Sequence, residues 1–168
     1  MRDTIPANRA DGYRRWFAYE QDSHERVFAS LATVPEGGRF GPAFQKALML
    51  MRHLAAARQL WLFRFGASQK KPDDFFPAGL SLAETTNRIT QVQKAWSDYF
   101  ARLDQAELSR TFDESLEGGR FRNTVEDILT QLFGHSLYQR GQIASLIREA
   151  GGEPAQTDFV FWTREALP

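Results

Sequence analysis

The chain has no cysteine, no net charge and no long run of apolar residues. The missing cysteine excludes a disulfide framework, a cysteine-ligated zinc or iron–sulfur site and a cysteine nucleophile. Lysine plus arginine and aspartate plus glutamate both number 21, so the formal charge is zero. Because binding to a polyanion needs concentrated positive charge, we expect no nucleic-acid partner.

Signals for membranes and for secretion are also missing. The longest purely apolar stretches are residues 47–51 and 60–63, far short of the ~20 residues that a membrane-spanning helix needs. Residues 1–10 contain early charges and no apolar core of a signal peptide. The sequence also lacks a Gly-x-Ser-x-Gly nucleophile elbow and a glycine-rich phosphate loop. We therefore expect a cytoplasmic protein with no membrane partner, built as one domain over residues 1–168.

What the sequence does have is helical periodicity in four segments, each bounded by residues that start or stop helices. Proline at position 42 suits a first helical turn, and Ser81-Leu-Ala-Glu84 has the pattern of a capping box. Two glycines at 151–152 stop the last segment. The expected helices run from about Asp11 to Thr33, Pro42 to Gly66, Ser81 to Leu103, and Asn123 to Gly151.

The remaining segments complete the fold prediction. Residues 112–122 predict a small β-hairpin around Gly118-Gly119, and the aromatic tail after Asp158 is expected to pack back on the helices. Gly141, in the middle of the fourth helix, costs roughly 1 kcal/mol relative to alanine, and we expect close helix packing to compensate for this cost. Four amphipathic helices with little strand predict an all-α four-helix bundle with a short β-hairpin between helices 3 and 4.

Polar side chains interrupt the apolar faces of three of these helices. His135 and Gln139 stand four residues apart on the fourth helix, so their side chains lie one turn apart. Glu20 and His24 have the same spacing on the first helix. His53 lies on the second helix, which is apolar nearly all round. All three histidines of the chain are therefore expected to face inward, beside a carboxylate and an amide.

Two interpretations of these inward residues stay open. Buried polar groups need partners, so each histidine is either a hydrogen-bonded core residue or the ligand of a metal ion. Imidazole suits zinc, nickel, copper or iron. For the nearby Arg140 and Gln142 we favour a contact on the helix surface or a pair at an interface over contact with a substrate anion. Arg52 and Arg58, which flank His53, are expected to be solvated or salt-bridged.

The fourth helix also carries a recognisable pattern. Residues 135–143 read His-Ser-Leu-Tyr-Gln-Arg-Gly-Gln-Ile, followed by Leu146-Ile-Arg-Glu-Ala-Gly-Gly-Glu-Pro154 and Asp158. This resembles the damage-inducible DinB-like family, whose pattern is H-x-x-x-H-R-G-Q, then L-R-x-x-G-x-x-P and an aspartate. The segment His-Leu-Ala-Ala-Ala-Arg-Gln-Leu-Trp-Leu at 53–62 resembles the family's H-x-x-x-A-x-x-x-W-L region. The resemblance covers essentially the whole chain.

The resemblance implies a four-helix bundle that binds nickel or zinc through three histidines, one from the second helix and two from the fourth. In this sequence the corresponding positions are His53, His135 and Gln139. Glutamine thus stands where the family has its second helix-four histidine. An amide oxygen is a weaker donor to these metals than imidazole, so the affinity should fall. His24 is the remaining histidine that could take the third place, with Glu20 beside it.

The resemblance also implies a class of reaction. Related enzymes transfer low-molecular-weight bacterial thiols or isomerise thiol adducts, and their metal turns a thiol into a thiolate. We therefore expect a divalent-metal-dependent enzyme of the S-transferase or hydrolase type, with a small-molecule substrate and a weakened metal site. The alternative is a non-catalytic bundle that has lost the metal and binds a small molecule or a protein. Under both interpretations a homodimer is expected, because family members often pair through bundle faces.

Overall fold

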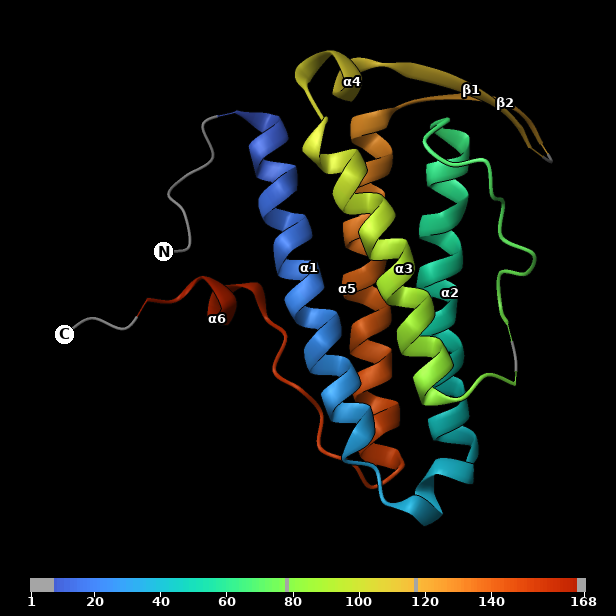
Figure 1. The fold of residues 1–168 in the computed structure, drawn as a ribbon, viewed down its shortest axis with the longest axis vertical. Helices are drawn as coiled ribbons and strands as arrows, with labels where there is room; N and C mark the ends of the chain where they lie inside the picture. The colour runs from blue at the N-terminus through green and yellow to red at the C-terminus, as the bar shows by residue number, and fades with distance from the viewer. Residues whose placement is uncertain (1–7, 78, 117, 166–168) are drawn as a thin grey trace.

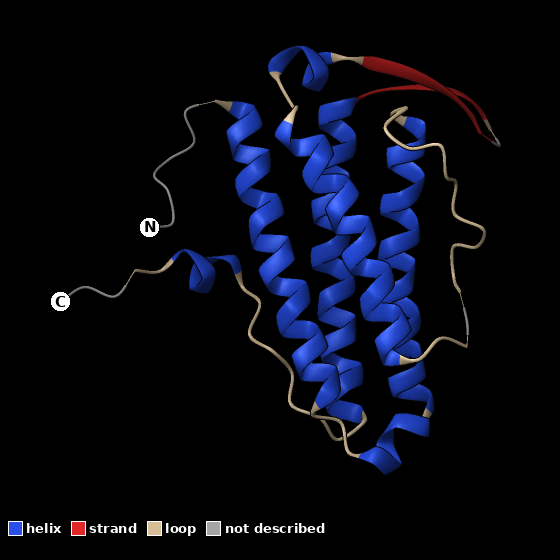
Figure 2. Cartoon of the chain, viewed as in Figure 1, coloured by secondary structure: helices blue, strands red, loops and turns tan. Residues whose placement is uncertain are grey.

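Four long helices lie side by side in the computed structural model, which describes residues 8–77, 79–116 and 118–165 (Figure 1). They are α1 (Arg9–Ala32), α2 (Pro42–Arg64), α3 (Leu82–Ala101) and α5 (Val125–Glu149). The shorter elements are η1 (Glu36–Phe40), α4 (Gln105–Ser109), β1 (Thr111–Leu116), β2 (Gly119–Thr124) and α6 (Phe159–Thr163). Figure 2 shows that the described chain is mostly helical and has one β-hairpin. The fold is therefore the all-α four-helix bundle that the sequence predicts. None of the described helices is both long and apolar enough to cross a membrane.

The path of the chain places two parallel helices next to each other. In Figure 1, α1 and α5 run in one direction and α2 and α3 run in the other. Each of α1 and α2 packs against both α3 and α5, so α1 and α2 stand at diagonal corners of the bundle. Because α2 and α3 are parallel, residues 65–81 must return along the whole length of α2, about 35 Å. We call this connection the crossover loop.

Local sequence sets the helix ends. The Ser81 side chain accepts a hydrogen bond from the Glu84 backbone N–H, and the Glu84 carboxylate accepts one from the backbone N–H of Ser81. Thr124 and Asp127 make the same reciprocal pair at the start of α5. These capping boxes satisfy backbone donors that have no partner within the helix. The four predicted helices agree with the observed bounds within two residues at each end.

The hairpin and the tail also follow the sequence pattern. Strands β1 and β2 pair antiparallel, from Thr111 opposite Thr124 to Leu116 opposite Gly119. After α5 the chain returns along α1, where the ring of Phe159 stacks on Trp16 with centroids 4.6 Å apart. The Tyr19 hydroxyl donates to the Thr157 carbonyl. The aromatic tail is thus part of the packed structure, as predicted.

The explanation given above for Gly141 is wrong. A Cβ atom built at Gly141 would meet no heavy atom of the described chain within 4 Å, apart from its own stretch of helix. Close packing instead occurs at Gly152, where a Cβ would lie 2.6 Å from Val34 Cγ2 and 3.0 Å from Ile147 Cγ2. Gly152 therefore allows the chain to pass closely over the ends of α1 and α5.

Candidate functional site

Packing of α2 against α5 brings three of the predicted site residues together. His53 on α2 and His135 on α5 meet with their Nε2 atoms 3.3 Å apart. Gln139, one turn beyond His135, places its Nε2 atom 3.1 Å from the same ring nitrogen. Both rings are partly buried, and they meet edge to face at 87°. The site is thus two imidazoles and an amide on facing helices.

The crossover loop supports His53 from outside the bundle. The Nδ1 atom of His53 lies 3.0 Å from the Phe75 carbonyl oxygen. The Phe76 ring stacks on the imidazole at a centroid distance of 4.4 Å and an angle of 2°. A carbonyl oxygen can only accept a hydrogen bond, so Nδ1 of His53 must carry a proton. In the neutral ring the lone pair is then on Nε2, facing His135.

With the Gln139 amide oriented as it is and both rings neutral, one of the two contacts to His135 is unsatisfied. If the His135 Nε2 atom accepts a hydrogen bond from Gln139, it presents a lone pair to the lone pair of His53. If instead it carries a proton and donates to His53, the Gln139 amide N–H faces another N–H group. Both contacts are satisfied if a cation, either a second proton on His53 or a metal ion, lies between the rings. They are also satisfied if the Gln139 amide is reversed, so that its oxygen and the His53 Nε2 atom both accept from the Nε2–H group of His135.

The surroundings of His135 favour its neutral form. Burial lowers the pKa of His135, and the positive charges of His53 and Arg58 lower it further, whereas Glu20 acts in the opposite direction. The pKa therefore lies below the ordinary value of 6.5. Near neutral pH the ring is uncharged, which is the form that ligates metals.

The other two predicted site residues belong to a separate, deeper cluster. Glu20 is 1% exposed and forms an ion pair with Arg58 of α2, which is also buried. The His24 Nδ1 atom accepts a hydrogen bond of 3.1 Å from the side-chain amide of Gln93 on α3, and its Nε2 atom lies 3.9 Å from a Glu20 oxygen. Among the described residues, His24 makes no hydrogen bond or ring contact with the other two histidines.

The charges of this cluster compensate one another only in part. Burial acts to raise the pKa of Glu20, but Arg58 and the other nearby positive groups outweigh it, so the pKa lies below the ordinary 4.5. Burial lowers the pKa of His24 to about 4, so the ring is neutral. Arg140 adds a second buried guanidinium, which donates to the Tyr19 hydroxyl at 2.7 Å. One carboxylate therefore faces two guanidinium groups.

The cluster around Glu20 and the histidine site are in contact through neighbouring residues of α5. Ser136, next to His135, accepts a hydrogen bond of 3.4 Å from Arg58. The structure thus brings His53, His135 and Gln139 together and places His24 and Glu20 with the arginines. Within the described ranges, no group of three or more His, Cys, Asp or Glu side chains is arranged to hold a metal ion. The predicted ligand set stays a prediction.

The sequence did not reveal the roles of two of the three arginines near the site. Arg140 is 4% exposed, so the predicted surface contact is wrong. Arg58 is salt-bridged, as expected. Arg52 is neither solvated nor paired with an acid: it is 2% exposed and donates to the Leu80 carbonyl at 2.7 Å. The available signal was their position on helix faces that are otherwise apolar.

Fold and site together define an all-helical bundle with an imidazole pair between two antiparallel helices. Comparison with protein families identifies the group: the model of the DinB family matches residues 8–166. The chain belongs to the DinB family. No curated protein matches it significantly.

Proposed function

We propose that this DinB-family protein binds a divalent metal ion, nickel or zinc, between α2 and α5. The Nε2 atoms of His53 and His135 would be the main ligands, and the amide oxygen of Gln139 a weak third. The metal would serve transferase or hydrolase chemistry of the thiol-dependent type on a small-molecule substrate. When bound, such an ion acts as a Lewis acid that lowers the pKa of a coordinated thiol or water.

The facing ring nitrogens of His53 and His135 are the observation on which this proposal rests. Two nitrogen ligands of a tetrahedral zinc ion, each ~2.0–2.1 Å from the metal, are roughly 3.3 Å apart. The two Nε2 atoms are 3.3 Å apart. The N–H group of His53 that points to the Phe75 carbonyl adds the support that metal-ligating histidines usually have.

Gln139 sets the expected strength of binding. Its NH2 group faces His135, while its Oε1 atom accepts a long hydrogen bond of 3.5 Å from Gln142. Ligation through Oε1 requires the amide to rotate by half a turn, which gives up this weak bond and the contact of the NH2 group with His135. Since the amide oxygen is a poorer donor than imidazole, we expect weaker binding than at a three-histidine site.

A second candidate function follows from the same three side chains. If His53 carries a second proton, it donates both to the Phe75 carbonyl and to His135, while Gln139 also donates to His135. Every described contact of the site is then satisfied without metal. In that state the protein would be a non-catalytic bundle that binds a small molecule or a protein.

Metal content separates the two candidates. Untagged protein, purified without chelator, would be analysed by mass spectrometry for nickel and zinc, with Gln139→His beside it. We expect metal in the wild type and more in the variant. An empty wild type beside a loaded variant would favour the non-catalytic function. Two empty proteins would rule out the metal proposal.

We also propose a homodimer. Large apolar side chains are exposed on the described surface, among them Phe40 at 82% and Tyr138 at 68%. Light scattering after gel filtration would test this, and a monomeric mass at micromolar concentration would contradict it.

A further inference from the structure

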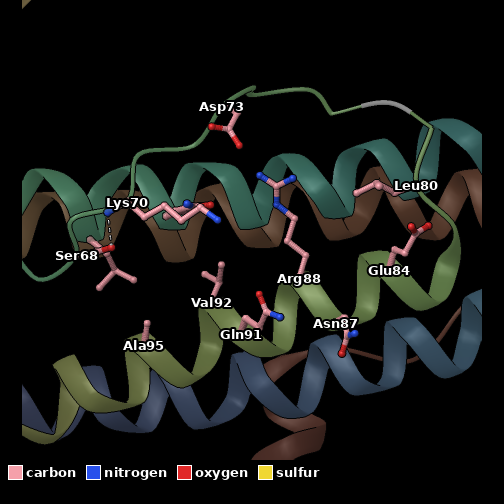
Figure 3. Close-up of a pocket in the computed structure, with 12 residues that line it drawn as sticks. Ser68, Lys70, Asp73, Leu80, Glu84, Asn87, Arg88, Gln91, Val92 and Ala95 are labelled. Carbon is pink, nitrogen blue, oxygen red and sulfur yellow. Dashed lines mark hydrogen bonds between the residues drawn. The ribbon is translucent and has the colours of Figure 1, made fainter.

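A groove lies on the flank of α2 opposite the histidines, between α2, α3 and the crossover loop (Figure 3). Leu62, which lines it, is nine residues beyond His53, which corresponds to half a turn around the helix axis. The groove has a volume of about 450 Å³, which is within the range of small-molecule sites. Leu62, Val92 and Ala95 form an apolar part of the lining.

Arg88 of α3 brings a positive charge into this groove without a partner. Figure 3 shows its side chain extending from α3 toward the loop that carries Asp73. Arg88 is half-buried, yet its side chain makes no hydrogen bond, ion pair or ring contact with any residue that the structure describes. Some other arginines of the surface do have such partners: Arg26 pairs with Asp22, and Arg64 with Glu114.

A second guanidinium lies beneath the groove. Arg52 donates through Nη1 to the carbonyl of Leu80, which lines the groove. Its Nε atom is buried and has no hydrogen-bond partner in the described chain. Burial lowers the pKa of Arg52, and the nearby positive charge of Arg88 lowers it further. The two guanidinium groups therefore repel each other, and an anion bound in the groove would relieve this repulsion.

The acidic residues of the groove do not supply that anion. Glu84 is committed to the capping box, where its carboxylate accepts from the backbone and the hydroxyl of Ser81. Asp73 is exposed and forms no ion pair within 4.0 Å with Arg88 or with Lys70, which also lines the groove. The positive charges of the groove are thus available to a ligand.

We propose that this groove binds a small anionic molecule, a carboxylate or a phosphate monoester that carries an apolar group. The anion would lie on Arg88, with Lys70 and Arg52 nearby, because the planar guanidinium matches both kinds of oxyanion. The apolar group would cover Leu62, Val92 and Ala95. This site does not involve the histidine pair.

Calorimetric titration with phenyl phosphate and with benzoate tests this proposal, on protein first stripped of metal with EDTA and then dialysed free of EDTA, so that neither metal nor chelator contributes. We expect saturable binding of at least one probe, weakened about tenfold or more by Arg88→Gln. Arg148→Gln is the matched control, since Arg148 is exposed on α5, outside the groove. Asp73→Asn should tighten binding, because it removes a negative charge.

Phenyl phosphate represents a phosphate monoester and benzoate represents a carboxylate. Binding of either probe supports the proposal. Absence of saturable binding for both probes would overturn it. Equal losses in Arg88→Gln and Arg148→Gln would also overturn it, since binding would then reflect general surface charge. Phenol that binds as tightly as phenyl phosphate would contradict a role for the charge. Weaker binding in Asp73→Asn would contradict the placement of the anion.

Discussion

The Nδ1 atom of His53 lies 3.0 Å from the carbonyl oxygen of Phe75, and this contact determines which ring nitrogen faces His135. The carbonyl comes from the crossover loop, which is long because α2 and α3 run parallel. The topology of the bundle therefore helps to set which ring nitrogen of His53 carries the proton. A lone pair on Nε2 is thus directed at the second imidazole, where a proton or a metal ion can bind.

Metal affinity should depend on pH, because protons compete for the same nitrogen atoms. From pH 7.5 to pH 5.5 we expect the apparent zinc affinity to fall at least about tenfold. Competition with a chromophoric chelator at several pH values measures this. Gln139→His should show a steeper decline, since one more imidazole must lose its proton. An affinity that does not change with pH would contradict ligation by histidine.

The buried ion pair of Glu20 and Arg58 should be important for stability. Glu20→Gln leaves the Arg58 guanidinium without its counter-ion in the core, so we expect a loss of about 3–5 kcal/mol in unfolding free energy. Asp22→Asn on the same helix is the control, because the Asp22–Arg26 pair is on the surface and is worth about 0–1 kcal/mol. Urea unfolding measures both, and equal losses would contradict the burial argument.

His24 should make the protein less stable in mild acid. Its pKa is about 4 in the folded chain against an ordinary value of 6.5, so between these values the unfolded chain binds more protons. The contribution of His24 to the unfolding free energy is therefore fully present above pH 6.5. It is lost as the pH drops toward 4, by up to about 3 kcal/mol.

Unfolding by urea at pH 7.5 and pH 5.0 tests this dependence. His24→Gln should reduce the difference between the two pH values, because the variant has no proton to gain there. His135→Gln is a useful comparison, since the pKa of His135 is also lowered and contributes with the same sign. An unchanged difference in His24→Gln would show that His24 does not carry the effect.

Two glycines should respond to alanine in opposite directions. Gly152→Ala places a methyl group 2.6 Å from Val34 Cγ2, and we expect a loss of about 1–3 kcal/mol. Gly141→Ala meets open space within a helix, and we expect a gain of about 0.5–1 kcal/mol. Thermal unfolding of the two variants measures this contrast. Destabilisation by Gly141→Ala would restore the packing explanation for that residue.

Periodicity and capping residues were sufficient to predict the bundle. Helix ends are decided by a few adjacent residues, such as Ser81 with Glu84, so the sequence shows them directly. The hairpin follows from its Gly-Gly turn in the same way. The sequence also placed His53, His135 and Gln139 on inward faces, and the packing of α2 against α5 brings these three side chains together.

Interactions between distant segments could not be predicted in this way. The partner of His53 is a backbone carbonyl, which any residue at position 75 would supply. The burial of Arg58 and Arg140 depends on Glu20 and Tyr19 of another helix, and residue spacing does not reveal such pairs. Likewise, the sequence placed Glu20 and His24 inward but could not decide whether they join the other histidines.

Calorimetric titration of the untagged protein with zinc, compared with His53→Ala, His135→Ala and His24→Gln, tests the central claim most directly. We predict that each of the first two variants abolishes binding, because each removes one of the two facing nitrogens. We predict that His24→Gln binds as the wild type does, because His24 contacts Gln93 and lies beside Glu20. Wild-type affinity in His53→Ala or His135→Ala would contradict the proposed site.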